Sequence, residues 1–129
     1  MILLDTHAWL WLRSSPEKLS SQGRSFTLGE PLAVSAISCW EVATLSRLGR
    51  IKLDSSVDAW IGRALSGQPE ISVVPVSRDI ATNAGGLDEP FPGDPADRII
   101  FTTAVVLKCS LLTKDRRLRD YSPAVAVWD

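Results

Sequence analysis

The stretch Ile2-Leu3-Leu4-Asp5-Thr6-His7 holds the pattern that decides the fold. Three consecutive apolar residues are typical of a strand that is buried on both faces, as in a parallel sheet. The acid that follows is a favourable N-cap for a helix, and the apolar run 8–12 continues as that helix. This segment therefore predicts a buried strand that passes directly into a helix, with Asp5 at the junction.

The same alternation of strand and helix continues along the rest of the chain. Further strands are expected at 32–34, 71–76, 111–113 and 125–128, and helices at 37–48, 56–65, 77–84 and 94–108, with one more beginning at Pro16. Such alternation predicts an α/β fold with three layers, α/β/α, around a central and mainly parallel sheet. A length of 129 residues suits one domain that spans residues 1–129.

Four carboxylates stand where a predicted strand gives way to the segment that follows it. They are Asp5, Glu41, Asp97 and Asp115. Ligands of open parallel sheets bind in the crevice outside the carboxyl ends of the strands, so acids placed repeatedly at that edge can share one pocket. Packed carboxylates repel one another unless a cation or a proton offsets their charge, and oxygen ligands suit Mg²⁺ or Mn²⁺. The pattern predicts a metal-dependent phosphodiesterase.

Each acid also has a purely structural interpretation. Asp5 can cap the first helix, Asp94 before a proline is a typical N-cap, and Asp97 suits the first turn of the same helix. Asp115 can be an ordinary turn residue after a strand. Glu41 is the most informative acid, because it lies within an apolar pattern, where an unpaired buried carboxylate would be costly. The structural alternative is a Glu41 that faces solvent.

Charge and composition narrow the functional classes. The formal net charge of -1 argues against a generic nucleic-acid coat, but bound divalent ions would cancel several of the counted negative charges. Basic residues crowd beside Asp115, namely Lys114, Arg116, Arg117 and Arg119. Such a cluster either lies on a solvated face or binds the phosphate backbone of a nucleic acid.

The cysteines, the N-terminus and the apolar stretches bear on the cellular compartment, and the tryptophans bear on the hydrophobic core. Cys39 and Cys109 suggest no disulfide framework, the N-terminus lacks a secretory pattern, and the longest apolar stretch is too short for a membrane span. A cytoplasmic protein with no membrane association is expected. Most of the five tryptophans should be core. Trp9 and Trp11 are two residues apart on one helix, so one of them should reach a groove or a subunit interface.

Four segments together carry a resemblance to a known family. They are Leu3-Leu4-Asp5-Thr6-His7, the Ser35-x-x-Ser38-x-x-Glu41 stretch, Asp94-Pro95-Ala96-Asp97-Arg98-Ile99-Ile100, and Leu112-Thr113-Lys114-Asp115. In this order and at this chain length, the sequence resembles a PIN-domain ribonuclease, and within that group the VapC toxins of type II toxin–antitoxin pairs. One difference is mild: Ser38 stands where many members carry threonine, which keeps the hydroxyl.

The resemblance implies a site and a set of partners. Asp5, Glu41, Asp97 and Asp115 would be the catalytic, metal-binding acids, with Thr113 or Ser38 as a polar helper. It further implies an endoribonuclease that depends on Mg²⁺ or Mn²⁺, forms a homodimer, cleaves RNA and is inhibited by a cognate antitoxin protein. Whether Asp94 joins the site stays open.

The residue types agree with hydrolysis by water. No Ser/His/Asp or Cys/His arrangement is evident, so a metal-activated water is the expected nucleophile. His7, the only histidine, is either structural, an orienting partner of Asp5 or a contact to substrate. Arg98, Lys114 and Arg116 are candidates to hold flanking phosphates of the RNA.

Two alternatives belong to other functional classes. A response-regulator receiver is also a parallel α/β domain with an acidic Mg²⁺ pocket, and Lys114 could mimic its lysine. However, the first predicted strand ends in a single acid, and a receiver has no use for Glu41. The other alternative is a PIN-like binding module that has lost catalysis, against which the presence of all four acids argues.

Overall fold

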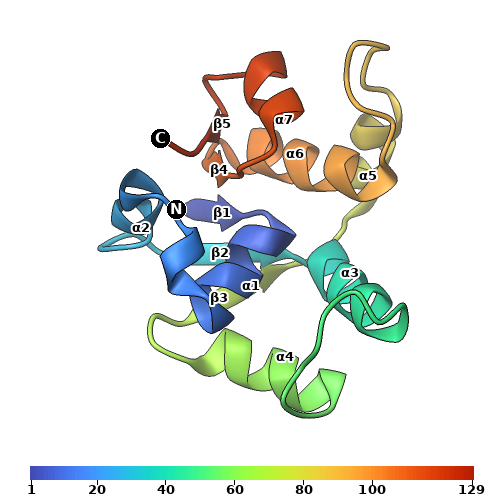
Figure 1. Ribbon diagram of the computed structural model, residues 1–129. Coiled ribbons are helices and arrows are strands. Elements are labelled where there is room, and N and C mark those ends of the chain that lie inside the picture. Colours follow the sequence, from blue (N-terminus) through green and yellow to red (C-terminus); the bar gives the residue numbers. More distant parts are fainter.

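The computed structural model describes residues 1–129 and contains one central sheet of five parallel strands (Figure 1). The strands are β1 (Ile2–Leu4), β2 (Leu32–Ser35), β3 (Ile71–Val74), β4 (Ser110–Leu112) and β5 (Ala126–Val127), in the order β3-β2-β1-β4-β5. In the centre, Leu3 of β1 stands opposite Ala33 of β2 and Leu111 of β4. The expected parallel α/β architecture is confirmed.

Helices connect the strands. They are α1 (Thr6–Ser14), the 3₁₀ helix η1 (Pro16–Lys18), α2 (Ser21–Phe26), α3 (Ala36–Arg47), α4 (Val57–Ser66), α5 (Arg78–Gly85), α6 (Pro95–Leu107) and α7 (Arg116–Tyr121). Most begin at a serine or aspartate whose side chain accepts a hydrogen bond from a backbone N–H of the first turn.

Two segments differ from the sequence-based expectation. Pro16 begins only a single 3₁₀ turn, because Leu19 is extended and the Ser20 hydroxyl starts a separate helix by accepting from the Gly23 N–H at 2.8 Å. Helix α7 was not expected from the sequence, since its apolar pattern is short. Its buried Leu118 and its cap at Asp115 nevertheless hold one helical turn and a half after β4.

Alternating side chains of β1 belong to two cores, one on each face of the sheet. Ile2 and Leu4 pack in the core that includes α1 and α4, where the Trp9 and Trp60 rings lie 5.3 Å apart. Leu3 packs on the opposite face with residues of α6 and α7. Helices thus cover both faces, which confirms the three layers (Figure 1).

The tryptophans follow the expected division only in part. Trp9 is fully buried, whereas Trp11 is only half-buried, so the two do diverge as expected. Trp60 and Trp128 are also buried. Trp40 is 59% exposed on α3, which contradicts a core position for that ring. No helix of the structure combines the length and the apolar character that a membrane crossing needs.

The strand order reverses between β1 and β4, which is the position where sheets of this kind form a ligand-binding crevice. The chain leaves β1 toward β2 on one side and later returns to β4 on the other side. Open parallel sheets bind ligands at the carboxyl ends of strands where the order reverses in this way. Asp5 follows β1 directly, and Thr113 to Asp115 follow β4.

Candidate active site

Asp5 is held at the end of β1 by two strong hydrogen bonds. Its Oδ1 accepts the Thr6 N–H at 2.8 Å, which is the expected helix cap, and its Oδ2 accepts the Thr113 hydroxyl at 2.6 Å. Asp5 is only 3% exposed and Thr113 is fully buried. The capping interpretation of Asp5 is confirmed, and the site interpretation is compatible with it, since one oxygen caps α1 and the other contacts the end of β4.

Thr6 connects Asp5 to Glu41. The Thr6 hydroxyl donates to Oε1 of Glu41 on α3, and it lies 2.8 Å from the Ser38 hydroxyl. A hydroxyl has one proton, so Ser38 donates to Thr6 when Thr6 donates to Glu41. Glu41 turns toward β1 rather than away to solvent, and Ser38 supports it through Thr6. Sequence reasoning did not single out Thr6 as a site residue, although its hydroxyl next to Asp5 was a visible signal.

Asp97 reaches the same region from the first turn of α6. Its backbone N–H donates to Oδ1 of Asp94 at 3.0 Å, so Asp94 is the N-cap that the sequence predicted. The Asp97 side chain is 16% exposed. Asp94 thus has a structural role, and its carboxylate still contributes negative charge near Asp97 and Glu41.

Asp115 and Arg117 form an ion pair at the start of α7. Oδ1 of Asp115 accepts the Arg117 N–H at 2.9 Å, and Arg117 Nη2 lies 2.9 Å from Oδ2 of Asp115. The same Nη2 lies 3.4 Å from Oδ2 of Asp97. Arg117 therefore links two of the four predicted acids.

The charges of these acids are not balanced within the chain. Burial, together with the charges of Asp5, Asp94, Asp115 and Glu41, raises the pKa of Asp97 to about 7. Burial also raises the pKa of Glu41, against the hydrogen bond from Thr6. By contrast, the hydrogen bond from Arg117 lowers the pKa of Asp115. The structure brings all four predicted acids into one electrostatic neighbourhood with an excess of negative charge.

The three predicted phosphate-binding residues have different surroundings. Arg98 Nη1 donates to the Ala84 and Leu87 carbonyls at 3.0 and 3.2 Å, which ties α5 to α6. Lys114 places its Nζ 5.5 Å from the centre of the Trp11 ring. Arg116 makes no hydrogen bond or ion pair and is exposed. A substrate role stays a prediction for all three, and Arg98 has a structural task besides.

His7 lies at the rim of the site. Its Nε2 accepts the Lys114 N–H at 3.3 Å and stands 3.8 Å from Oδ2 of Asp5. An imidazole nitrogen that accepts a hydrogen bond carries no proton, so this nitrogen does not donate to Asp5. His7 therefore contacts the segment after β4 and leaves Thr113 as the side chain that orients Asp5.

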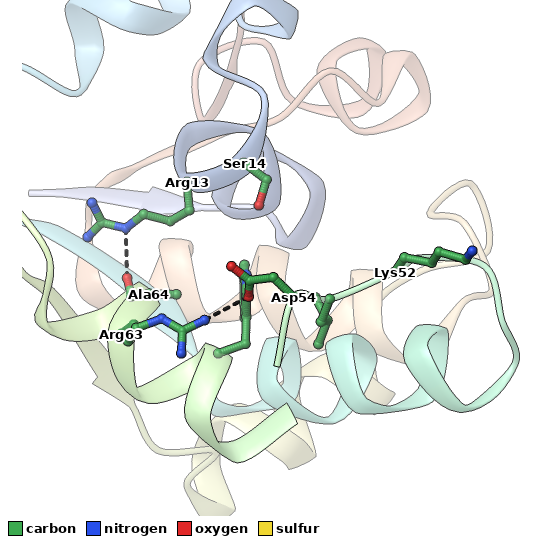
Figure 2. Close-up of a pocket in the computed structure, with 8 residues that line it drawn as sticks. Arg13, Ser14, Lys52, Asp54, Arg63 and Ala64 are labelled. Atoms are coloured by element: carbon green, nitrogen blue, oxygen red, sulfur yellow. Dashed lines mark hydrogen bonds and ion pairs between the residues drawn. The ribbon is translucent and has the colours of Figure 1, made fainter. Parts of the chain in front are cut away.

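A cavity of about 480 Å³ lies elsewhere, between α1, α4 and the loop that precedes α4 (Figure 2). It is lined by Arg13, Ser14, Lys52, Leu53, Asp54, Trp60, Arg63 and Ala64. Figure 2 shows that its arginines are engaged: Arg13 Nε donates to the Ala64 carbonyl at 2.8 Å, and Arg63 pairs with Asp54 at 2.7 Å. None of the four acids lines this cavity, so the acidic crevice and the cavity are separate features.

Comparison with known proteins identifies the class to which this fold and this acidic crevice belong. The PIN domain family matches residues 2–122, so the chain belongs to the PIN-domain family. It is 37% identical over 130 residues to Ribonuclease VapC22 of Mycobacterium tuberculosis (strain ATCC 25618 / H37Rv), with 98% of each chain covered. The resemblance to VapC ribonucleases and the expected nuclease class are confirmed, in place of a receiver domain.

Solved structures agree on the fold. A toxin-antitoxin complex from Klebsiella pneumoniae contains a chain that is similar with a TM-score of 0.70 and 21% identity, covering 98% of this chain and 96% of that chain. VapBC2 from Rickettsia felis, bound to a DNA fragment from its promoter, gives a TM-score of 0.68 at 16% identity with complete coverage of both chains. At such identities the likeness establishes the three-layer fold alone.

Proposed function

We propose that this protein is a metal-dependent endoribonuclease and the toxin of a type II toxin–antitoxin pair. One observation carries the proposal: Asp5, Glu41, Asp97 and Asp115 converge at the carboxyl edge of β1 and β4 in a PIN-domain chain. The name of the relative Ribonuclease VapC22 supports RNA as the substrate. All four acids are present, which favours catalysis over a binding module.

The donor set suits a hard divalent cation. It consists of carboxylate and hydroxyl oxygens, and the raised pKa of Asp97 reflects its burial and, after that, the negative charge of the neighbouring acids. No group of three or more His, Cys, Asp or Glu side chains is arranged to enclose an ion in this conformation. Mg²⁺ commonly keeps several waters and uses one or two carboxylates, so it fits this site better than an ion that needs an all-protein cage. Mn²⁺ is the alternative ion.

The roles of the residues follow from their contacts. Asp5, fixed by Thr113, and Asp97 would hold the ion, while Glu41 and Asp115 would hold it directly or through water. When bound, a divalent ion lowers the pKa of a coordinated water and stabilises charge on the phosphate and on the departing oxygen. The Thr6 and Ser38 hydroxyls keep Glu41 turned toward the reaction site.

The proposal also includes the partners of this protein. The structural relatives include a toxin-antitoxin complex, which supports a cognate antitoxin for this chain as well. The Arg117 guanidinium lies between Asp97 and Asp115, so the crevice accepts a basic side chain of the kind that an inhibitory partner would insert. A homodimer and a cytoplasmic location complete the proposal.

The test is an assay of the purified protein on total cellular RNA with Mg²⁺, with Mn²⁺ and with EDTA. We expect cleavage with a divalent ion, none with EDTA, and none by the Asp5→Asn variant, which controls for contaminating nucleases. Cleavage that persists in EDTA would overturn the metal dependence. A folded wild-type protein that binds RNA but cleaves none in either metal would favour the binding-module alternative.

A further inference from the structure

Two lysines from distant parts of the chain each place a charged side chain against the same tryptophan ring, beside the predicted acidic site. Lys114, which follows β4, places its Nζ 5.5 Å from the centre of the Trp11 ring, and Lys18, which ends η1, places its Nζ 5.9 Å from the same centre. The faces of an indole ring attract cations, which explains why both side chains lie there. Both ammonium groups therefore lie within 5.9 Å of one ring centre, although 96 positions separate the two lysines in the chain.

No carboxylate neutralises this pair. Neither lysine belongs to any ion pair of the structure, and both residues are exposed. Two positive charges against one ring make the local electrostatic potential positive, and an anion bound beside them would offset that charge. The aromatic ring offsets only part of the charge, because it is a quadrupole and not an ion. The arrangement is thus suited to an anionic ligand.

The platform under the two lysines is fixed. The Trp11 ring packs against the buried Trp128 ring at 5.9 Å in an edge-on geometry and against the His7 ring at 5.2 Å. The backbone of Lys114 is held on both sides, since its N–H donates to His7 Nε2 at 3.3 Å and its carbonyl accepts from Arg119 Nη2 at 3.1 Å. The ring and the backbone that carries Lys114 are therefore held in place by the fold.

The platform adjoins the proposed reaction site. Lys114 stands between Thr113, whose hydroxyl holds Asp5, and Asp115. His7 stands between the Trp11 ring and Asp5. An anion bound at this platform would therefore lie beside the chain segment that carries Thr113 and Asp115, on the side of Asp5 that His7 occupies.

We propose that Lys18 and Lys114, held over Trp11, bind a backbone phosphate of single-stranded RNA that flanks the cleaved bond. This inference rests on the proposed ribonuclease function and adds to it the path of the substrate. Lys18 is a substrate-binding residue under this proposal and touches none of the reacting atoms. Replacement of Lys18 should weaken RNA binding much more than it slows cleavage of the bound RNA.

The experiment measures binding and cleavage separately. Binding of a labelled single-stranded RNA is followed by fluorescence anisotropy in EDTA, where no cleavage occurs, at a series of KCl concentrations. Lys18→Gln should weaken binding severalfold and lower the slope of log K against log salt by about 0.7, the value for one lost phosphate contact on a single strand. Lys18→Arg keeps the charge and should therefore show the same salt slope as the wild type.

Lys52→Gln is the matched control, because Lys52 is also exposed but lines the separate cavity of Figure 2. It removes the same charge and should leave the salt slope unchanged. In Mg²⁺, Lys18→Gln should raise KM severalfold with a much smaller change in kcat. A salt slope of Lys18→Gln equal to that of Lys52→Gln, in a protein that still cleaves RNA, would overturn this inference and leave the proposed function intact. Wild-type protein that cleaves no RNA would overturn both.

Discussion

The Thr113 hydroxyl donates a 2.6 Å hydrogen bond to Oδ2 of Asp5 across a sequence separation of 108 residues. It joins the ends of the two central strands at the point where the acids gather. Thr113→Val keeps the shape but leaves a buried carboxylate oxygen without this donor. We expect a loss of about 1–3 kcal/mol in the free energy of unfolding. Cleavage should also fall strongly, because Asp5 would lose its orientation. Urea unfolding and kcat/KM measure the two effects.

Thr102 offers a matched control on α6. It is also buried, at 4% exposed, but its hydroxyl has no hydrogen-bond partner. Replacing a buried, unpaired hydroxyl by a methyl group removes a cost, so Thr102→Val should be neutral or stabilising. It should also leave cleavage unchanged. Equal destabilisation by the two variants would show that Thr113 matters for packing and not for its contact with Asp5.

Asp5→Asn and Asp94→Asn separate catalysis from helix capping. Asparagine is a good N-cap, so both variants should keep their helices and nearly all of their stability. A neutral amide binds a hard cation poorly, and Asp5→Asn should therefore lose most of its RNase activity. Asp94→Asn should stay active, since Asp94 caps α6 through the Asp97 N–H. Activity assays together with thermal unfolding test this pair. A loss for Asp94→Asn as large as that for Asp97→Asn would place Asp94 in the site.

The fold was predictable from the sequence because its signals are local. The apolar run before Asp5 and the Asp94-Pro95 pair each define an element boundary without knowledge of the rest of the chain. Helix α7 was missed because its stability comes from a single buried residue, Leu118, and from a cap at Asp115 that reads equally well as a turn. The 3₁₀ turn at Pro16 was taken for a longer helix, because a proline in a first turn does not reveal helix length.

The convergence of the four candidate acids was likewise predictable from the sequence, but the side chains that contact them were not. Strand ends are visible in the sequence, whereas the facing of Arg117 toward Asp97 depends on the unpredicted helix α7. The role of Thr6 depends on the approach of α3 to the end of β1, which is a long-range contact. The platform of Trp11 under two lysines depends on η1 returning over α1. Each of these contacts requires tertiary structure.

Asp97 makes the stability of the metal-free protein depend on pH. Its pKa in the folded protein is about 7, well above the ordinary 3.8, because burial and four acids disfavour the charged form. Between these values the folded protein keeps a proton that the unfolded chain has lost, so stability falls as pH rises and the loss is complete above about pH 7. Asp97→Asn should therefore raise the free energy of unfolding in EDTA at about pH 8 and have little effect at about pH 4.

Urea unfolding at the two pH values checks this sign, and activity provides the second readout. The variant should be more stable than the wild type at the higher pH and yet inactive, since it lacks a metal-binding carboxylate. Saturating Mg²⁺ should remove the difference in stability, because the cation offsets the charges that surround Asp97. A variant that is less stable than the wild type at both pH values would contradict the raised pKa.

Inhibition by a cognate antitoxin should depend on the metal concentration. A basic side chain placed between Asp97 and Asp115, where Arg117 now lies, would compete with Mg²⁺ for the same carboxylates. We expect the inhibition constant to rise as Mg²⁺ rises at fixed ionic strength, which a titration of the antitoxin at several Mg²⁺ concentrations measures. Inhibition that ignores Mg²⁺ would indicate that the partner blocks the RNA path instead.

Arg117 itself should compete with the divalent ion. Its Nη2 lies 2.9 Å from Asp115 and 3.4 Å from Asp97, so an ion that uses these carboxylates must displace the guanidinium or share them with it. Arg117→Gln removes this competitor. The side chain is 64% exposed, and exposed ion pairs contribute about 0–1 kcal/mol, so Mn²⁺ binding should tighten by at most about fivefold. Arg116→Gln removes the same charge next door without these contacts and should change the affinity less. Isothermal titration of Mn²⁺ into both variants decides the matter, and weaker binding by Arg117→Gln would mean that Arg117 orients Asp115 for the ion.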